Sequence, residues 1–154
     1  MSAERARMAS MTAPYYEDVQ VGQELPAVLK TPSNVQLFMF SAVTWNLHRI
    51  HYDADFARQH DGLPNVLAHR PLLGSYLAQV LTDWVGDTGR LLRLEWSNRG
   101  PAVPGDRLMC RGRVTAKRWE SDTGIVECDV WVEKEDGDVI VPGKAEVALP
   151  SRRS

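Results

Sequence analysis

A short polar segment, TWNLHRIHYD, carries the side chains of this chain that are best suited to acid–base chemistry. It places Asn46 five positions before His51 and directly follows an apolar stretch. A histidine with an ordinary pKa of about 6.5 is mostly neutral at pH 7 and can accept a proton. The amide of Asn46 can donate and accept hydrogen bonds but cannot act as a base. The pair could therefore activate a water molecule that Asn46 holds and His51 deprotonates.

The spacing of Asn46 and His51 sets a condition on the backbone. Residues on one face of a helix lie three or four positions apart, so residues five apart do not converge on a regular helix. The change from apolar to polar residues after Trp45 predicts that the helix ends there and that the chain turns back. In the alternative interpretation, Asn46 caps the helix and His51 is a structural histidine. Residue types alone leave both interpretations open.

The segment LAHRPLLGSY is a second candidate for chemistry, because it leads into the longest predicted helix, residues 69–84. Backbone N–H groups in the first turn of a helix lack partners within it and can bind a developing oxyanion. Pro71 has no N–H, so the candidates are the amides near Arg70 and Leu72. An ordinary helix start is the alternative.

A third set consists of basic residues in and around the predicted strands. They could bind the phosphates of a nucleotide-tailed carrier, or they could simply form a solvated face. The set is Arg90, Arg93, Arg99, Arg107, Arg111, Arg113, Lys117 and Arg118.

The helices that must position these residues have recognisable starts. Thr31 can cap a helix that begins at Pro32 and runs to Trp45, and its many apolar residues predict a largely buried helix. Asp53 can cap a short amphipathic helix. The helix over residues 69–84 is apolar around most of its circumference, so we expect other structure to surround it.

After residue 88 the apolar period changes from 3.6 to 2, which predicts strands with one buried face. Short polar turns at residues 121–124 and 135–138 indicate antiparallel neighbours. With a strand candidate near the N-terminus, the chain is predicted to be an α+β domain whose helices lie on one face of a sheet. The expected buried residues are Leu92, Leu94, Trp96, Leu108, Cys110, Val114, Val126, Cys128, Val130, Val132, Ala145, Val147 and Leu149.

Composition limits the classes of function. The chain has 154 residues and a formal net charge of −2, which favours one domain and gives no global field for nucleic acid or an anionic membrane. No segment has the length or apolarity of a membrane span or signal core, and the two cysteines fit no metal or redox motif. We therefore expect a cytoplasmic protein with no metal, a disordered extension over residues 1–13, one domain over residues 14–150 and a solvated tail at the terminal SRRS.

The residues resemble the MaoC-like dehydratase family, the R-specific enoyl-CoA hydratases with the hot-dog fold. The resemblance rests on WNLHRIHYDADFA, GLPNVLAHRPLLGSYLAQVL, PAVPGDRLMCRGRVTAKR and DGDVIVPGKAEVAL, and it spans most of residues 15–149. It implies a curved antiparallel sheet wrapped around a long central helix. It also implies a hydro-lyase that adds water reversibly across the 2,3 double bond of an enoyl-CoA, with coenzyme A entering only as part of the substrate.

Two segments depart from the family pattern. Asn46 stands where the family motif has Asp, five positions before His51, and His48-Arg49 replaces the usual Asn-Pro pair. The His-Arg-Ile-His-Tyr-Asp segment is similar to the 3-methylfumaryl-CoA (mesaconyl-CoA type) hydratase subgroup. The central helix of the family starts with His-Gly, whereas this chain has His69-Arg70, which keeps the backbone N–H but adds a cationic side chain.

The resemblance assigns roles to individual residues. The implied catalytic residues are Asn46, His51 and the amide of Arg70. The substrate-binding residues expected beside them are Trp45, Arg49, His69, Leu72, Tyr76 and Arg99.

Unpaired sheet edges predict a homodimer or higher homo-oligomer. Because Asn46 removes a carboxylate, a non-catalytic acyl-binding subunit paired with a second hot-dog chain stays open as an alternative. A thioesterase is less favoured, because the acidic residue of the central helix, Asp83, lies near its end.

Overall fold

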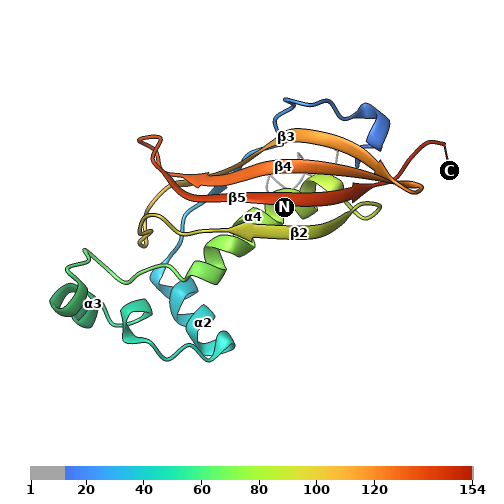
Figure 1. Cartoon of the computed structure of the whole chain (residues 1–154). Helices are drawn as coiled ribbons and strands as arrows, with labels where there is room; N and C mark the ends of the chain where they lie inside the picture. Colours follow the sequence, from blue (N-terminus) through green and yellow to red (C-terminus); the bar gives the residue numbers. More distant parts are fainter. Residues whose placement is uncertain (1–12, 154) are drawn as a thin grey trace, which may run out of the picture.

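The computed structural model describes residues 13–153, which form an α+β fold (Figure 1). One antiparallel sheet has the strand order β1-β3-β4-β5-β2. Its strands are β1 (Val28–Lys30), β2 (Arg90–Trp96), β3 (Leu108–Glu120), β4 (Thr123–Glu133) and β5 (Val139–Leu149). The helices are η1 (Tyr16–Asp18), α2 (Asn34–Thr44), η2 (Arg49–His51), α3 (Ala54–Asp61) and α4 (Arg70–Val85). Apart from Ala13, the extension expected over residues 1–13 lies outside the described residues.

The long helix α4 lies against one face of the sheet and contacts β2, β3, β4 and β5, while α2 and α3 project beyond its end (Figure 1). The expected helix over residues 69–84 is observed at Arg70–Val85, and Pro71 lies in its first turn. Its buried residues are Leu72, Leu73, Gly74, Tyr76, Leu77, Val80, Leu81, Trp84 and Val85. Full burial of one such apolar side chain stabilises the fold by about 1.5–3 kcal/mol, so α4 is the core element. The predicted hot-dog arrangement is confirmed.

The predicted buried faces of β3, β4 and β5 are confirmed, whereas that of β2 is confirmed at Leu94 and wrong at Leu92. Leu92 is 48% exposed, while Leu91 and Leu94 pack against the core. Trp96 is 41% exposed, but its ring lies over Gly74 of α4. A bulge between Leu91 and Arg93 in the pairing with β5 is the cause. An extra residue in one strand reverses the alternation on either side of it, which a strict period of two cannot reveal.

The helix α2 differs from its prediction at its start and in its burial. Ser33, rather than Thr31, is the N-cap, and its hydroxyl accepts a hydrogen bond from the amide of Gln36 at 3.1 Å. Pro32 therefore precedes the helix. Only Leu37 and Ser41 of α2 are buried, so the predicted largely buried helix is wrong for the single chain. The predicted cap of α3 is confirmed, since Asp53 accepts from the amide of Phe56 at 2.9 Å.

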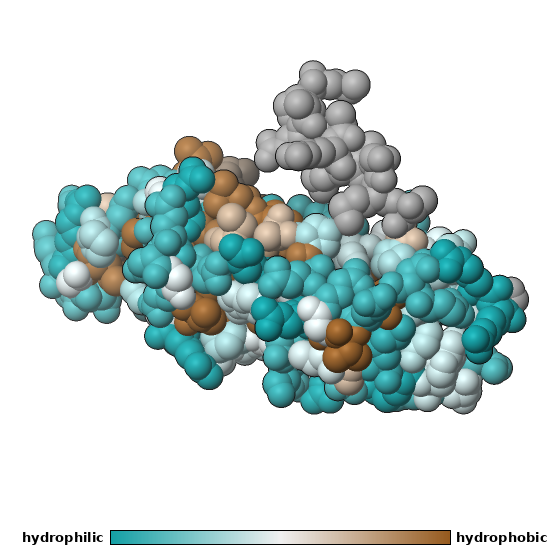
Figure 2. All heavy atoms as spheres, turned by 90° about the horizontal axis from the view of Figure 1, so that it is seen from above, coloured by the Kyte–Doolittle hydropathy of each residue, from teal (hydrophilic) through white to brown (hydrophobic). Residues whose placement is uncertain are grey.

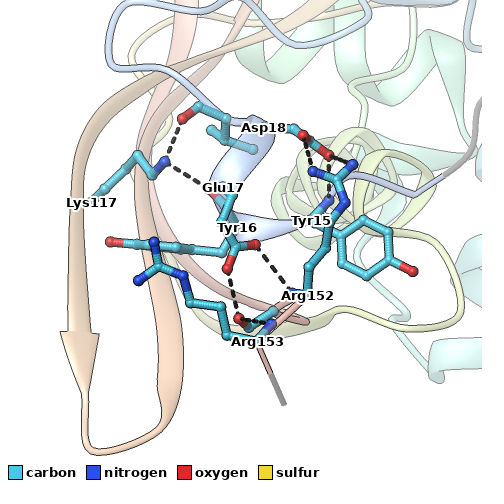
Figure 3. A network of polar contacts seen from close by, with 9 residues as sticks. Tyr15, Tyr16, Glu17, Asp18, Lys117, Arg152 and Arg153 are labelled. Carbon is cyan, nitrogen blue, oxygen red and sulfur yellow. Dashed lines mark hydrogen bonds and ion pairs between the residues drawn. The ribbon is translucent and has the colours of Figure 1, made fainter.

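The C-terminal residues are held against η1 rather than solvated as predicted (Figure 3). Arg152 donates to both carboxylate oxygens of Asp18 at 2.6 and 2.7 Å, and the Ser151 hydroxyl donates to Glu17 at 2.6 Å. The ammonium of Lys117 on β3 donates to the carbonyl of Tyr16 at 2.6 Å and also to that of Val19. These contacts tie the two ends of the described chain to the sheet.

Cys110 and Cys128 are buried free thiols, and burial raises the pKa of each to about 12. They are therefore inert apolar side chains of the core, as expected. Within residues 13–153, no helix combines the length and apolarity needed to cross a membrane.

Candidate active site

The backbone between Asn46 and His51 leaves the helical path, which fulfils the condition set by their spacing. Trp45 ends α2 in the left-handed conformation with φ of 55°, and the amide of Asn46 donates to the Ser41 carbonyl at 2.9 Å. The chain then forms the short turn η2, which ends at His51. The polar segment therefore lies at the junction between α2, α3 and the start of α4 (Figure 1).

His51 is held in the tautomer that a base requires. Its Nδ1 lies 2.7 Å from the carbonyl oxygen of Leu67. A carbonyl can only accept, so Nδ1 carries the proton and donates it, which leaves the Nε2 lone pair available. Leu67 is itself held by a second hydrogen bond, in which its amide donates to the Ile50 carbonyl at 2.8 Å.

Burial favours the neutral form of His51. The pKa of His51 is lowered from 6.5, chiefly by partial burial and also by the charge of protonated His48, while the hydrogen bond to Leu67 opposes the shift. The lowered pKa means that a larger fraction of His51 is unprotonated at neutral pH than of an ordinary histidine.

His69 lies behind His51 and is fully buried. The two imidazole rings stack with centroids 3.8 Å apart and an interplanar angle of 19°, and Phe40 packs on His69 with ring centroids 4.8 Å apart. His69 Nε2 lies 2.8 Å from the Ser41 hydroxyl, whereas its buried Nδ1 has no hydrogen-bond partner among residues 13–153. A proton on the unpaired Nδ1 would leave a buried donor without an acceptor, which costs more free energy than a buried lone pair without a donor. Nδ1 is therefore unprotonated, and Nε2 carries the proton. Burial lowers the pKa of His69 to about 4, with a further contribution from His51.

Asn46 is oriented by the backbone that follows it. Its Oδ1 accepts a hydrogen bond from the amide of His48 at 3.1 Å, which leaves its NH2 group to donate. A donor can hold a water molecule through one of the two lone pairs of the water oxygen. Asn46 forms no hydrogen bond with His51 in the described structure.

The first residue of α4, Arg70, supplies an amide that has no acceptor within the helix. This amide is the predicted oxyanion donor, and it follows directly after His69, whose ring stacks on His51. Arg70 is exposed and is one of the residues that line a cleft of about 190 Å³, together with Leu67 and Arg99. The structure thus brings Arg70 and Arg99 together beside the segment that holds His51.

The other predicted contacts differ in their surroundings. Trp45 is 78% exposed, and Arg49 donates to Asp53 at 2.7 Å, so Arg49 already has an anionic partner. Leu72 and Tyr76 belong to the first two turns of α4, and their side chains are buried in the core. Their roles as substrate contacts stay predictions, as does that of His69, whose side chain can act only through His51.

Two residues that support the base were missed from the sequence. Leu67 acts through its backbone carbonyl, for which a sequence contains no signal. Ser41 did carry a signal, because it is a polar residue four positions after Leu37 on the one buried stripe of α2.

Among the described residues, no group of three or more His, Cys, Asp or Glu could hold a metal ion. The arrangement observed is an oriented imidazole with a lowered pKa, five positions after an asparagine whose NH2 group can donate and close to the start of α4. This combination suits proton transfer to and from water next to a carbonyl whose charge develops during reaction.

Comparison with solved structures identifies the class. The (R)-hydratase from A. caviae involved in PHA biosynthesis superposes with a TM-score of 0.78 and 25% identity over 87% of this chain and 99% of that chain. A MaoC-like dehydratase from Rhodospirillum rubrum has the same fold, with a TM-score of 0.78, 20% identity and coverage of 91% of this chain and 99% of that chain. The fold and the site together define a MaoC-like hot-dog protein.

Comparison with sequences identifies the family. The model of the hydroxyacyl-thioester dehydratase type 2 family matches residues 4–104, and the chain belongs to this family. A mesaconyl-C(4)-CoA hydratase from Chloroflexus aurantiacus is 41% identical over 63 residues, which are 37% of this chain and 22% of that protein. The matched region is therefore a small part of the length of this curated relative. The predicted family resemblance is confirmed.

Proposed function

We propose that the protein adds water reversibly across the 2,3 double bond of an enoyl-CoA thioester. The observation that carries the proposal is the hydrogen bond from His51 Nδ1 to the Leu67 carbonyl, 2.7 Å long, which leaves Nε2 as a free base. The family, described as hydroxyacyl-thioester dehydratases, and the similarity to an (R)-hydratase support the same reaction class.

In the hydration direction, His51 Nε2 takes a proton from the water that Asn46 holds, and the water oxygen bonds to C3 of the enoyl group. The electron pair of the double bond moves to the thioester oxygen, where the amide of Arg70 stabilises the enolate. The proton on Nε2 then passes to C2, so the product gains the whole water molecule. Dehydration follows the same steps in reverse, and coenzyme A takes part only as the carrier of the acyl group.

The first test is hydration of crotonyl-CoA by the purified protein, followed through loss of absorbance of the conjugated thioester. His51→Gln should lower kcat at least a hundredfold, because general base catalysis contributes about 10²–10⁴ to the rate. His60→Gln is the matched control, since His60 is an exposed histidine of α3 that stacks on Phe56. Equal turnover by His51→Gln and the wild type would refute the assignment.

The alternative of a non-catalytic subunit makes a different prediction for the same assay. Wild-type protein that is inactive alone, and becomes active only with a second hot-dog chain, would support that alternative. Restoring the carboxylate with Asn46→Asp gives a second criterion, since a catalytic chain should be active both with and without the change.

We propose further that the protein is a homodimer. Two features support this, namely the free edge strand β2 and the apolar residues that α2 leaves exposed. The predicted cytoplasmic location is compatible with two cysteines that remain thiols.

A further inference from the structure

The distance between Asn46 and His51 is set by other residues, because the two form no hydrogen bond with each other within residues 13–153. A base takes a proton from water efficiently only when the water is held within hydrogen-bond reach of it. A displacement of about 1 Å in such an arrangement lowers the rate by about a hundredfold. The contacts that fix Asn46 and His51 relative to each other are therefore part of the catalytic arrangement.

Ser41 on α2 is joined to Asn46 through the backbone. Its carbonyl accepts hydrogen bonds from the amide of Trp45 and, at 2.9 Å, from the amide of Asn46. These two bonds hold the chain at the point where α2 ends. Since they involve only backbone atoms, they do not depend on the side chain at position 41.

The hydroxyl of Ser41 is joined to His51 through the ring of His69. Its oxygen lies 2.8 Å from His69 Nε2, and the His69 ring stacks on the His51 ring with centroids 3.8 Å apart. Ser41 and His69 are only 5% and 0% exposed, so bulk water does not replace this hydrogen bond. Ser41 is therefore connected to both candidate residues, to one by its carbonyl and to the other by its hydroxyl.

The orientation of the His69 ring depends on Ser41. The ring lies between His51 and Phe40, with centroids 3.8 and 4.8 Å away. Such packing hardly distinguishes an imidazole from the same ring turned by half a rotation, so hydrogen bonds decide between the two. Because His69 Nδ1 has no hydrogen-bond partner among residues 13–153, the contact with Ser41 selects the orientation against which His51 packs.

We propose that Ser41 is a positioning residue, whose hydroxyl acts through the stacked ring of His69 to place the His51 imidazole against the water that Asn46 holds. The inference rests on the proposed hydration, since it assigns Ser41 by its effect on that proton transfer. The Ser41 side chain is buried behind His69 and does not touch the substrate. Its loss therefore lowers kcat and leaves KM unchanged.

The first experiment removes the hydroxyl and keeps the backbone bond to Asn46. Ser41→Ala leaves the His69 Nε2–H without an acceptor and should lower kcat for crotonyl-CoA by about tenfold to a hundredfold, with KM unchanged. Ser41→Cys fills the same space with a weaker acceptor and should lose part of the rate. Thr44→Val is the matched control, because the Thr44 hydroxyl donates to the Phe40 carbonyl within α2, at 2.6 Å, and its kcat should equal that of the wild type.

The His51→Gln background separates positioning of the base from a general loss of structure. If Ser41 acts through His51, Ser41→Ala should have no further effect on the residual kcat once the imidazole is absent. A change that only disturbs the fold would lower kcat by the same factor in both backgrounds, and that result would overturn the proposal.

Nuclear magnetic resonance of the imidazole nitrogens tests the same contact without turnover. Ser41→Ala should shift the ring signals of both His69 and His51, whereas Thr44→Val should leave them in place. Unchanged His51 signals in Ser41→Ala would overturn the proposal. A wild-type protein that does not hydrate crotonyl-CoA would instead refute the proposed function, and the ring spectra would still decide whether Ser41 orients His51.

Discussion

The two stacked histidines show how environment separates residues of the same type. His51 is half-buried with a free Nε2, while His69 is fully buried and hydrogen bonded to Ser41. A charge on His51 would face the His69 ring at 3.8 Å, which adds to burial in lowering the pKa of His69. His69 is therefore neutral at pH 7 and supports the His51 ring by packing.

The lowered pKa of His69 predicts a pH dependence of stability. The unfolded histidine has a pKa of about 6.5, and the folded one of about 4, so the unfolded state binds more protons between these values. The stabilisation is therefore complete above the unfolded pKa and is lost as pH falls toward the folded one. The full difference corresponds to about 3 kcal/mol of unfolding free energy.

Urea denaturation of the wild type, His69→Gln and His60→Gln at about pH 7 and about pH 4.5 measures this effect. His69→Gln should be less stable at neutral pH, because it loses the ring stack, and should lose less stability on acidification than the wild type. The exposed histidine variant His60→Gln should follow the wild type. The same loss on acidification in all three proteins would contradict the prediction.

At this scale residue type and spacing made His51 and Asn46 candidates and predicted the helix end at Trp45, and the family resemblance selected the two residues. The sequence could not show that the partner of His51 is a backbone carbonyl sixteen positions away. It also could not show that Asn46 uses its oxygen to bind the amide of His48. Both contacts depend on the path of the chain, which residue types do not specify.

Among the elements, α4 was predictable and β2 was not, for physical reasons. An apolar surface around most of a helix has one stable environment, which is the core. The bulge in β2 depends on pairing with β5, a strand more than forty positions later in the chain, so local alternation assigns Leu92 to the wrong face. The apolar composition of α2 predicted a largely buried helix. Composition, however, does not distinguish burial in a core from burial in an interface with another chain.

The contact between α4 and β2 depends on Gly74. A Cβ at this position would lie 2.3 Å from the Trp96 ring, inside van der Waals contact. Alanine favours a helix over glycine by about 1 kcal/mol, but overpacking costs about 1–3 kcal/mol, so Gly74→Ala should destabilise the fold.

Urea denaturation measures the unfolding free energy that Gly74→Ala is expected to lose. Thr82→Ala, an exposed change on the same helix, is the control and should have a small effect. The double variant Gly74→Ala/Trp96→Leu should recover part of the loss, because it removes the ring that clashes. A more stable Gly74→Ala protein would show that Trp96 moves aside at little cost.

The whole molecule exposes more apolar surface around α2 than a single chain needs (Figure 2). Most of the hydrophobic atoms in Figure 2 lie in the half of the molecule that carries α2, and a smaller separate group lies in the other half. The exposed residues of this segment are Val35, Phe38, Met39, Val43, Trp45 and Leu47. A contiguous patch of this kind marks an interaction surface, which agrees with the proposed homodimer.

Sedimentation equilibrium should therefore give twice the mass of the chain. Phe38→Asp places a charge in the exposed apolar patch, where Phe38 is 57% exposed, and should shift the equilibrium toward the monomer. Gln59→Asp, on an exposed part of α3, is the matched control and should leave the mass unchanged. A wild-type protein that remains monomeric at high concentration would contradict the dimer.

The two hydrogen bonds of Leu67 affect how the site tolerates insertion or removal of residues near α3. One joins its amide to Ile50 and the other joins its carbonyl to His51. The segment between His51 and Leu67, which contains α3, is therefore a loop whose two ends are held together by these hydrogen bonds. Because loop-closure entropy grows only slowly with loop length, inserting or removing residues in this loop costs little free energy of folding. His51 would keep its position while the residues of α3 change, so the length and sequence of α3 can vary in evolution without displacing the candidate catalytic histidine.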